Sequence, residues 1–188
     1  MEVKRRTLPY HLKVRRMLRQ RMKLADEDLR QLQSDEKGFE GECYFDQLIN
    51  RSPASTYLQL QDVLLKWHQS TFQIDSVLLG PHVIYLFDVK TFEGEFYIKG
   101  NRWFSITGKE INNPIHQLRS SEALFCSLIE SIGIHLPVES KIVFVHPEFT
   151  LYQANRNLPI ILPTILNAYL KSIEPVTVDR SLIEKAQN

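Results

Sequence analysis

Two aspartates and a lysine are the residues of this sequence whose types and spacing could do chemistry. Asp75 lies in residues 72–79 (FQIDSVLL), whereas Asp88 and Lys90 lie in residues 83–90 (VIYLFDVK). Both segments are predicted to be β-strands, because they are short, rich in apolar residues and separated by the turn residues Gly-Pro-His. A hairpin of this kind brings side chains from its two strands together, so it is the first place to look for a site.

The length of the loop between these strands decides which side chains face each other. With a two-residue loop, Asp75 lies directly opposite Asp88. Gln73 then lies opposite Lys90, and because side chains alternate along a strand, all four share one face. That face would also carry Val77, Leu79, Ile84 and Leu86, and the other face would carry Ile74, Leu78, Val83, Tyr85, Phe87 and Val89. With a longer loop the register shifts by one residue, and one of the two aspartates points to water.

Two carboxylates directly opposite each other require a positive charge between them. Their Cβ atoms would be about 4.5–5.5 Å apart, a distance at which like charges destabilise a strand pair. Burial would raise that cost or force one of the acids to bind a proton. Lys90 supplies one positive charge, but a divalent cation compensates better, because converging oxygen ligands suit Mg²⁺ or Mn²⁺. The pair Asp75 and Asp88 therefore predicts a magnesium or manganese site.

A helix predicted from an N-cap at Ser34 to about Asn50 carries a third acid. Glu42, Phe45 and Ile49 recur at helical spacing, so Glu42 falls within an otherwise apolar stripe. Such an acid could reach the strand acids. It could also lie at the edge of the stripe and reach solvent, and the spacing alone favours this second interpretation.

The remaining segments predict the rest of the fold. A strand is expected over 58–66, a hairpin over 95–99 and 102–106, a helix from Pro114 to near Gly133, a strand over 140–145 and a last helix over 163–171. This order of helices and strands predicts an α/β layer structure with a mixed central sheet.

Length and composition suit one domain, since the chain has 188 residues, 43% of them hydrophobic. Cys43 and Cys126 are too few and too far apart to predict a zinc site or a disulfide framework. We expect free thiols in a reducing cytoplasm. No run approaches the ~18 apolar residues of a membrane span, and the N-terminus lacks the apolar core of a secretory signal. A soluble, cytoplasmic protein without a membrane partner is therefore expected.

The N-terminal region is strongly basic, although the formal net charge of the chain is only +1. Residues 1–24 hold nine Lys or Arg against a single acid, Glu2. We predict a basic, largely helical extension over 1–34, a globular domain over 35–175 and a C-terminal tail over 176–188. The extension is either a solvated helix or an arm that contacts phosphates of a nucleic acid. The candidate phosphate contacts are Arg5, Arg6, Arg15, Arg16 and Arg19.

An ordered set of short motifs runs through the chain. They are Gly38-x-x-Gly41-Glu42, Gln73-Ile-Asp75, Gly80-Pro81, Asp88-Val-Lys90, Gly94, Trp103 and Asn113-Pro114-x-x-Gln117. Each motif alone is weak, but the set, in this order, resembles the nuclease-related domain family known as NERD. The resemblance covers roughly residues 37–146, which leaves out the basic extension and the C-terminal tail.

The resemblance implies a restriction-endonuclease-like core, because the family is held to be a branch of the PD-(D/E)xK nuclease superfamily. Asp75 would be the central metal-binding acid, Asp88 and Lys90 the (D/E)xK pair, and Glu42 the acid borne on a helix. Gln117 matches a glutamine that the family places near the site. The family more often has Glu at the position of Asp88, and the shorter side chain could shift the ion.

By the same resemblance the chain would be a metal-dependent nuclease that hydrolyses phosphodiester bonds, with DNA as the expected substrate. Asp75, Asp88 and the backbone carbonyl of Val89 would bind Mg²⁺ or Mn²⁺, with Glu42 bound directly or through water. Two other functions stay open. One is a nuclease-like module that binds nucleic acid or regulates without cutting, and the other is an interaction protein whose basic arm contacts an acidic partner.

Overall fold

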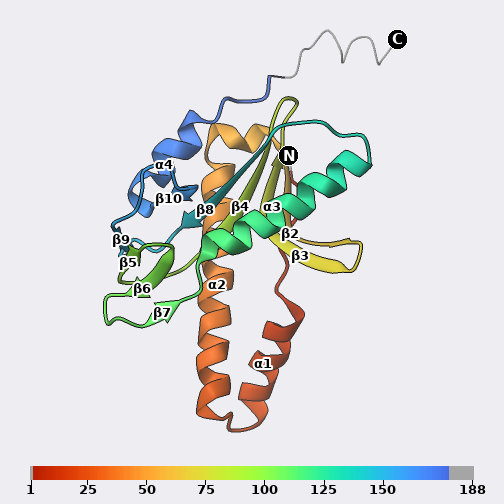
Figure 1. The fold of residues 1–188 in the computed structure, drawn as a ribbon. Coiled ribbons are helices and arrows are strands. Elements are labelled where there is room, and N and C mark those ends of the chain that lie inside the picture. Colours follow the sequence, from red (N-terminus) through yellow and green to blue (C-terminus); the bar gives the residue numbers. More distant parts are fainter. Residues whose placement is uncertain (1, 178–188) are drawn as a thin grey trace.

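A mixed six-stranded sheet forms the centre of the fold, which the computed structural model describes for residues 2–177. The strands are β1 (Glu2–Lys4), β2 (Leu58–Trp67), β3 (Ser70–Leu79), β4 (Ile84–Lys90), β8 (Val138–Phe144) and β10 (Ile160–Ile161), in the order β1-β2-β3-β4-β8-β10. β3 runs antiparallel to β2 and β4, whereas β8 runs parallel to β4 and β10, and β1 runs parallel to β2. The predicted α/β fold with a mixed central sheet is confirmed (Figure 1).

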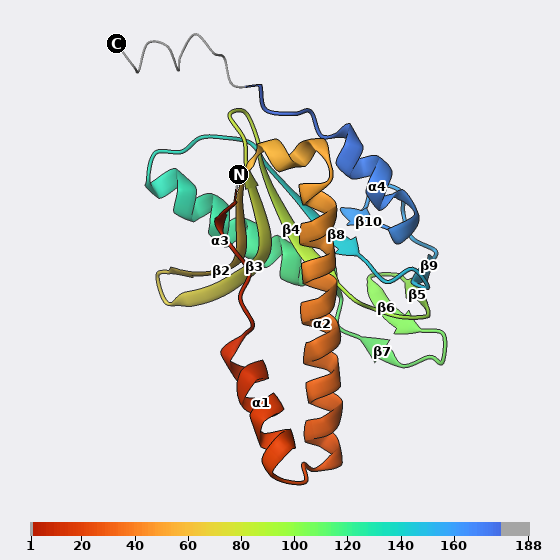
Figure 2. The ribbon, with the colours of Figure 1, turned by 180° about the vertical axis from the view of Figure 1, so that it is seen from behind.

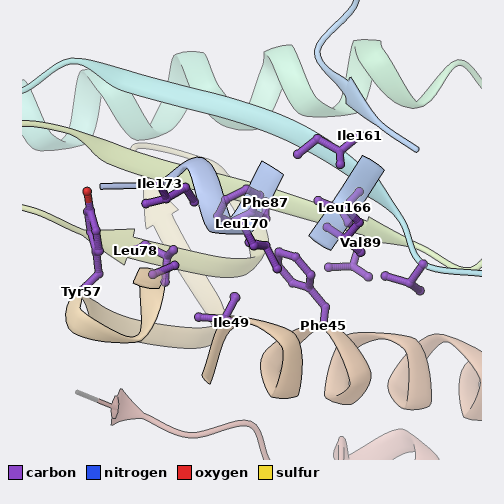
Figure 3. Close-up of a cluster of buried hydrophobic side chains, with 13 residues drawn as sticks. Phe45, Ile49, Tyr57, Leu78, Phe87, Val89, Ile161, Leu166, Leu170 and Ile173 are labelled. Atoms are coloured by element: carbon purple, nitrogen blue, oxygen red, sulfur yellow. The ribbon is translucent and has the colours of Figure 1, made fainter. Parts of the chain in front are cut away.

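Helices cover both faces of this sheet, as two opposite views show (Figures 1 and 2). Helix α2 (Asp26–Asn50) lies on one face and α3 (Pro114–Ser131) on the other, while α4 (Pro163–Ser172) shares the face of α2. The 3₁₀ turn η1 (Pro53–Thr56) joins α2 to β2. Figure 3 shows the core on the α2 side, where Phe45 and Ile49 of the helix meet Leu78 and Phe87 of the sheet. Burial on both faces explains why β3 and β4 are apolar on both sides.

A second, smaller sheet packs at the end of the first, where β4 and β8 finish. It contains β5 (Glu95–Lys99), β6 (Arg102–Ser105), β7 (Glu110–Ile111) and β9 (Thr150–Tyr152), in the order β7-β6-β5-β9. Trp103 of β6 is 1% exposed and packs with Phe144 and Phe149 in an aromatic cluster. Trp103 therefore belongs to the core, and it is not presented for stacking on bases.

The register of the β3–β4 hairpin agrees with the two-residue loop. Leu79 pairs with Ile84 and Ser76 with Phe87, and the N–H of Gly80 donates to the carbonyl of Val83 at 3.0 Å. Continued by one residue, this register brings Asp75 opposite Asp88.

Strand β3 departs from regular alternation at Asp75. The β2–β3 ladder keeps one register on both sides of Asp62 but skips the pair Asp62–Asp75, and Asp62 has a φ of 53°. As a result Ile74 packs in the same cluster as Val77, on the α3 side. The prediction that Ile74 lies on the face of Leu78 is wrong, because it assumed unbroken alternation through this irregular pair.

Helix α2 is longer at its start than predicted. It begins at Asp26, so Ser34 lies inside the helix and does not cap it, while the predicted end at Asn50 is confirmed. The acids in the first turn are Asp26, Glu27 and Asp28, where the helix dipole favours negative charge. A Ser followed by two acids is typical of a helix start, but here the acids at 35 and 36 have partners on another helix.

That other helix is α1 (Tyr10–Arg21), which forms a hairpin with the first half of α2. The hairpin projects away from the central sheet (Figure 2). Arg15 pairs with Asp35, and Arg16 pairs with Glu36 at 3.1 Å. Helices do form within residues 1–34, together with the short strand β1 at the edge of the sheet, but the boundary predicted after residue 34 falls inside the continuous helix α2.

Cys43 and Cys126 are half-buried free thiols, as expected. Within residues 2–177, no helix has the length and apolar character needed to cross a membrane. The predicted tail over 176–188 lies, from residue 178 on, outside the described residues.

Candidate metal centre

Asp75 and Asp88 meet where β3 and β4 leave their regular ladder. The Oδ2 atom of Asp75 accepts a hydrogen bond from the backbone N–H of Val89 at 2.7 Å. The Oδ1 atom of Asp88 accepts one from Nζ of Lys90 at 2.9 Å. Both aspartates are half-buried. The structure thus brings together the two acids and the lysine that the hairpin pattern singled out.

The positive charge near the two aspartates is too small to balance both carboxylates. Burial, the charge of Asp88 and the charge of Glu42 raise the pKa of Asp75 to about 8, although Lys90 acts in the opposite direction. The Oδ2 atom of Asp88 is buried and has no hydrogen-bond partner among the described residues. A buried carboxylate oxygen without a partner is unusual in a folded protein and requires an explanation such as an ion.

The backbone carbonyl of Val89 faces the same side as Asp75. In a strand the N–H and C=O groups of one residue point to the same edge. The N–H of Val89 points to Asp75, whereas the carbonyl of Lys90 accepts from Val145 at 3.1 Å on the β8 side. The Val89 carbonyl is therefore directed toward β3, the strand that carries Asp75.

Lys90 connects the acids to the start of α3. Its Nζ atom also donates to Oε1 of Gln117 at 3.3 Å. Gln117 lies in the first turn of α3, which Asn113 caps by accepting the N–H of Ile115 at 2.9 Å. A cavity of about 410 Å³ borders this corner, and its lining residues are Lys90, Phe92, Asn112, Asn113, Pro114, His116 and Gln117. The amine of Lys90 is thus held at the edge of a cavity large enough for a substrate group.

Glu42 lies near the strand acids but is paired with an arginine. Nη1 of Arg6 donates to Oε2 of Glu42, and Nε donates to Oδ2 of Asp46 at 2.8 Å. The side chain of Glu42 is 21% exposed, so Glu42 lies near the strand acids and also keeps some contact with solvent. Burial raises the pKa of Glu42, and the charge of Arg6 counteracts that rise.

Sequence reasoning missed Arg6 and Asp46 as members of this cluster. A signal was present, because Asp46 follows Glu42 by four residues on one helical face. Like charges at this spacing destabilise a helix. Two such acids in an apolar stripe indicate a cation from elsewhere in the chain.

The arginines predicted to contact phosphates differ in their surroundings. The side chain of Arg6 is 3% exposed and committed to acids of its own chain, so its predicted role as a phosphate contact disagrees with its position. Arg15 and Arg16 pair with acids of α2 but remain partly exposed. Arg5 and Arg19 are exposed.

The site fits a hard divalent ion that binds few protein ligands. Among residues 2–177, no three His, Cys, Asp or Glu side chains form a group that could hold a metal ion by themselves. Mg²⁺ commonly retains several waters and binds through one or two carboxylates. Asp75, the unpartnered oxygen of Asp88 and the Val89 carbonyl match that requirement.

The model of one protein family matches this chain. The family is described as the nuclease-related domain, NERD, and the match covers residues 37–145. This range includes Glu42, Asp75, Asp88, Lys90 and Gln117. No curated protein and no solved structure matches the chain significantly.

Proposed function

Because the chain belongs to the nuclease-related domain family, we propose that it is a metal-dependent nuclease whose expected substrate is DNA. The observation that carries the proposal is the buried Oδ2 atom of Asp88, which has no hydrogen-bond partner among residues 2–177 and lies beside Asp75, whose pKa is raised to about 8. This pair favours Mg²⁺ or Mn²⁺ as the cofactor, and the family favours a phosphodiester as the substrate. The expected location is the cytoplasm, which suits the free thiols Cys43 and Cys126.

Asp75, Asp88 and the carbonyl of Val89 would hold the ion. A bound ion would polarise a phosphoryl oxygen and lower the pKa of a water molecule. Lys90 stabilises the negative charge that develops on the phosphoryl group, and Gln117 keeps the lysine amine aligned. The oxygen of the attacking water bonds to phosphorus and the water gives up a proton to solvent, while the bond from phosphorus to the leaving sugar oxygen breaks and that oxygen takes up a proton from solvent.

The α1–α2 hairpin is our proposed contact surface for the phosphates of DNA. Exposed cations on this hairpin and just beside it include Arg5, Lys13, Arg19, Arg21, Lys23 and Arg30. Neutralising phosphates releases counterions, so DNA binding through this surface should weaken steeply with added salt. An acidic protein partner need not show this dependence.

A nucleic-acid-binding module that does not cut is the second candidate. The observation that favours it is the internal neutralisation of the acids, since Lys90 pairs with Asp88 and Arg6 pairs with Glu42. An inactive site could retain such pairs for stability. They do not reach the second oxygen of Asp88, which is why we prefer the nuclease.

Nicking of plasmid DNA by the full chain with Mg²⁺ or Mn²⁺ tests the proposal. Lys90→Ala should lower the nicking rate by about 10²-fold or more, the loss typical when a donor to developing charge is removed. Lys37→Ala is the matched control, because Lys37 is an exposed lysine paired with Glu93 on the surface. It should retain the full rate. Equal rates in the two variants would refute the assignment, and salt-dependent binding without any nicking would support the second candidate.

A further inference from the structure

We propose that Arg6 is a positioning residue of the metal centre, which holds the carboxylate of Glu42 and the main chain of Asp75 where an ion can use them. This inference rests on the proposed function, because it concerns the same ion. Arg6 precedes residues 37–145, so the role would come from outside the region that matches the family.

The guanidinium of Arg6 joins a helix to a strand. Nη1 donates to the carboxylate of Glu42 and Nε to that of Asp46, both on α2. Nη2 donates to the backbone carbonyl of Asp75 on β3 at 2.6 Å. The planar guanidinium presents several donors in a fixed fork, so it can bind these three groups at once, whereas a lysine amine is a single point charge. Arg6 thus fixes α2 relative to β3 at the two positions that carry Glu42 and Asp75.

The main chain around Arg6 is held independently of these acids. Strand β1 pairs with β2 at the sheet edge, and the N–H of Arg6 donates to Oε1 of Gln61 at 2.7 Å. Nζ of Lys4 donates to the carbonyl of Gln61 at 2.7 Å. Gln61 is itself buried. Because the backbone is anchored, the side chain of Arg6 reaches the acids from a fixed origin.

Loss of Arg6 would change ion binding through two effects of opposite sign. Removing a cation beside the acids strengthens their attraction for a metal ion, because like charges repel. Removing the hydrogen bonds that orient the acids weakens binding, and the loss of such a partner typically costs about 10–100-fold in metal affinity. The two effects predict opposite results, so a measurement of affinity distinguishes them.

The experiment is a titration of the full chain with Mn²⁺ alone, in which the electron paramagnetic resonance signal reports the free ion. We expect Arg6→Gln to weaken Mn²⁺ binding by about tenfold or more. Arg6→Lys retains the positive charge but loses the fixed planar set of N–H donors. It should therefore also weaken Mn²⁺ binding, by about threefold or more. Arg16→Gln is the matched control, because it breaks the Arg16–Glu36 pair on the projecting hairpin. It should leave the affinity unchanged.

Circular dichroism and thermal unfolding would establish that each variant is folded at the temperature of the titration. Unchanged or tighter Mn²⁺ binding by folded Arg6→Gln overturns the inference and leaves the proposed function intact. If Arg6→Gln does not fold, Arg6→Lys decides in the same way. If the unaltered chain binds no Mn²⁺, the proposed function itself fails, and this inference fails with it.

Discussion

The acids on the helix and the acids on the strands are balanced in different ways. On α2, Glu42 and Asp46 share the guanidinium of Arg6, whose side chain is 3% exposed. On β3 and β4, Asp75 has a pKa raised to about 8, and one oxygen of Asp88 is buried without a partner among the described residues. Lys90 pairs directly with Asp88, whereas the carboxylate of Asp75 accepts only the backbone N–H of Val89 among the bonds within the described residues.

The comparison indicates that the helix acids already have a buried cation of the chain, whereas the strand acids are poised to bind a ligand. The helix acids fasten the N-terminal segment to the domain, because both of them pair with the buried guanidinium of Arg6. Burial and the charge of Asp88 disfavour the ionised form of Asp75, so folding makes this carboxyl hold a proton near neutral pH, and that requirement lowers the stability of the metal-free protein. Groups that destabilise the fold in this way cluster at functional sites. The predictions below test this difference, from the largest expected effect to the smallest.

Asp75→Asn should separate activity from stability. We expect the nicking rate to fall by at least about 10²-fold, more than the loss of an outer partner of a ligand gives. The melting temperature of the metal-free protein at neutral pH should rise, because asparagine is neutral in this buried position without taking up a proton. Its side-chain oxygen can still accept the N–H of Val89. Each 1 kcal/mol gained corresponds to about 2–4 °C in a chain of this size.

The matched change on the helix side is Asp46→Asn. It removes one of the two carboxylate charges that pair with the buried Arg6, so it should destabilise the fold by about 2 kcal/mol, the value of a hydrogen bond to a charged group. Thermal unfolding in the presence of a chelator measures both variants. If Asp75→Asn destabilises the protein as much as Asp46→Asn does, the two sets of acids are equivalent and the distinction fails.

Ion binding should depend on pH through Asp75. With a pKa of about 8, its carboxyl holds a proton in the metal-free protein near neutral pH, and an ion must displace that proton. Mn²⁺ affinity should therefore rise with pH up to about pH 8, by at most about tenfold per pH unit for one displaced proton. Isothermal titration calorimetry in buffers of different ionisation enthalpy would count the protons released.

The raised pKa of Asp75 also predicts how the stability of the metal-free protein changes with pH. The folded-state pKa of Asp75 lies above the ordinary value of 3.8, so its contribution is fully present below that ordinary value and is lost as pH rises through about 8. The melting temperature of the metal-free chain should fall over this window. Asp75→Asn should remove the fall. Parallel curves for the two proteins would contradict the assignment of the raised pKa.

Local rules were sufficient to predict the elements that hold the strand acids. The alternation of β4, the loop at Gly80 and the cap at Asn113 each depend on a few neighbouring residues, and the structure agrees with all three. The predicted pairing of Asp75 with Asp88 followed from that register. Lys90 and Gln117 then met because the cap fixes the start of α3.

Contacts between distant segments could not be predicted in this way. Arg6 meets acids 36 and 40 residues later in the chain, and nothing in the local pattern of a basic segment distinguishes a buried arginine from an exposed one. The start of α2 was misplaced for a related reason, because the acids at 35 and 36 pair with α1 and do not mark a helix start. The face on which Ile74 lies was mispredicted because Asp62 has a positive φ, and the sequence has no glycine at this position to indicate such a backbone conformation.

The smallest expected effect concerns the glutamine beside Lys90. The hydrogen bond from Lys90 to Gln117 is 3.3 Å long and partly exposed, so we expect it to contribute about 1 kcal/mol. Gln117→Ala should then lower kcat for nicking by about fivefold with an unchanged Mn²⁺ affinity. Gln73→Ala is the control, because Gln73 is also exposed and donates to Asp62 at 2.7 Å. If both variants lower kcat equally, Gln117 acts only through the general polarity of the cavity, and the strand acids and Lys90 alone account for the chemistry.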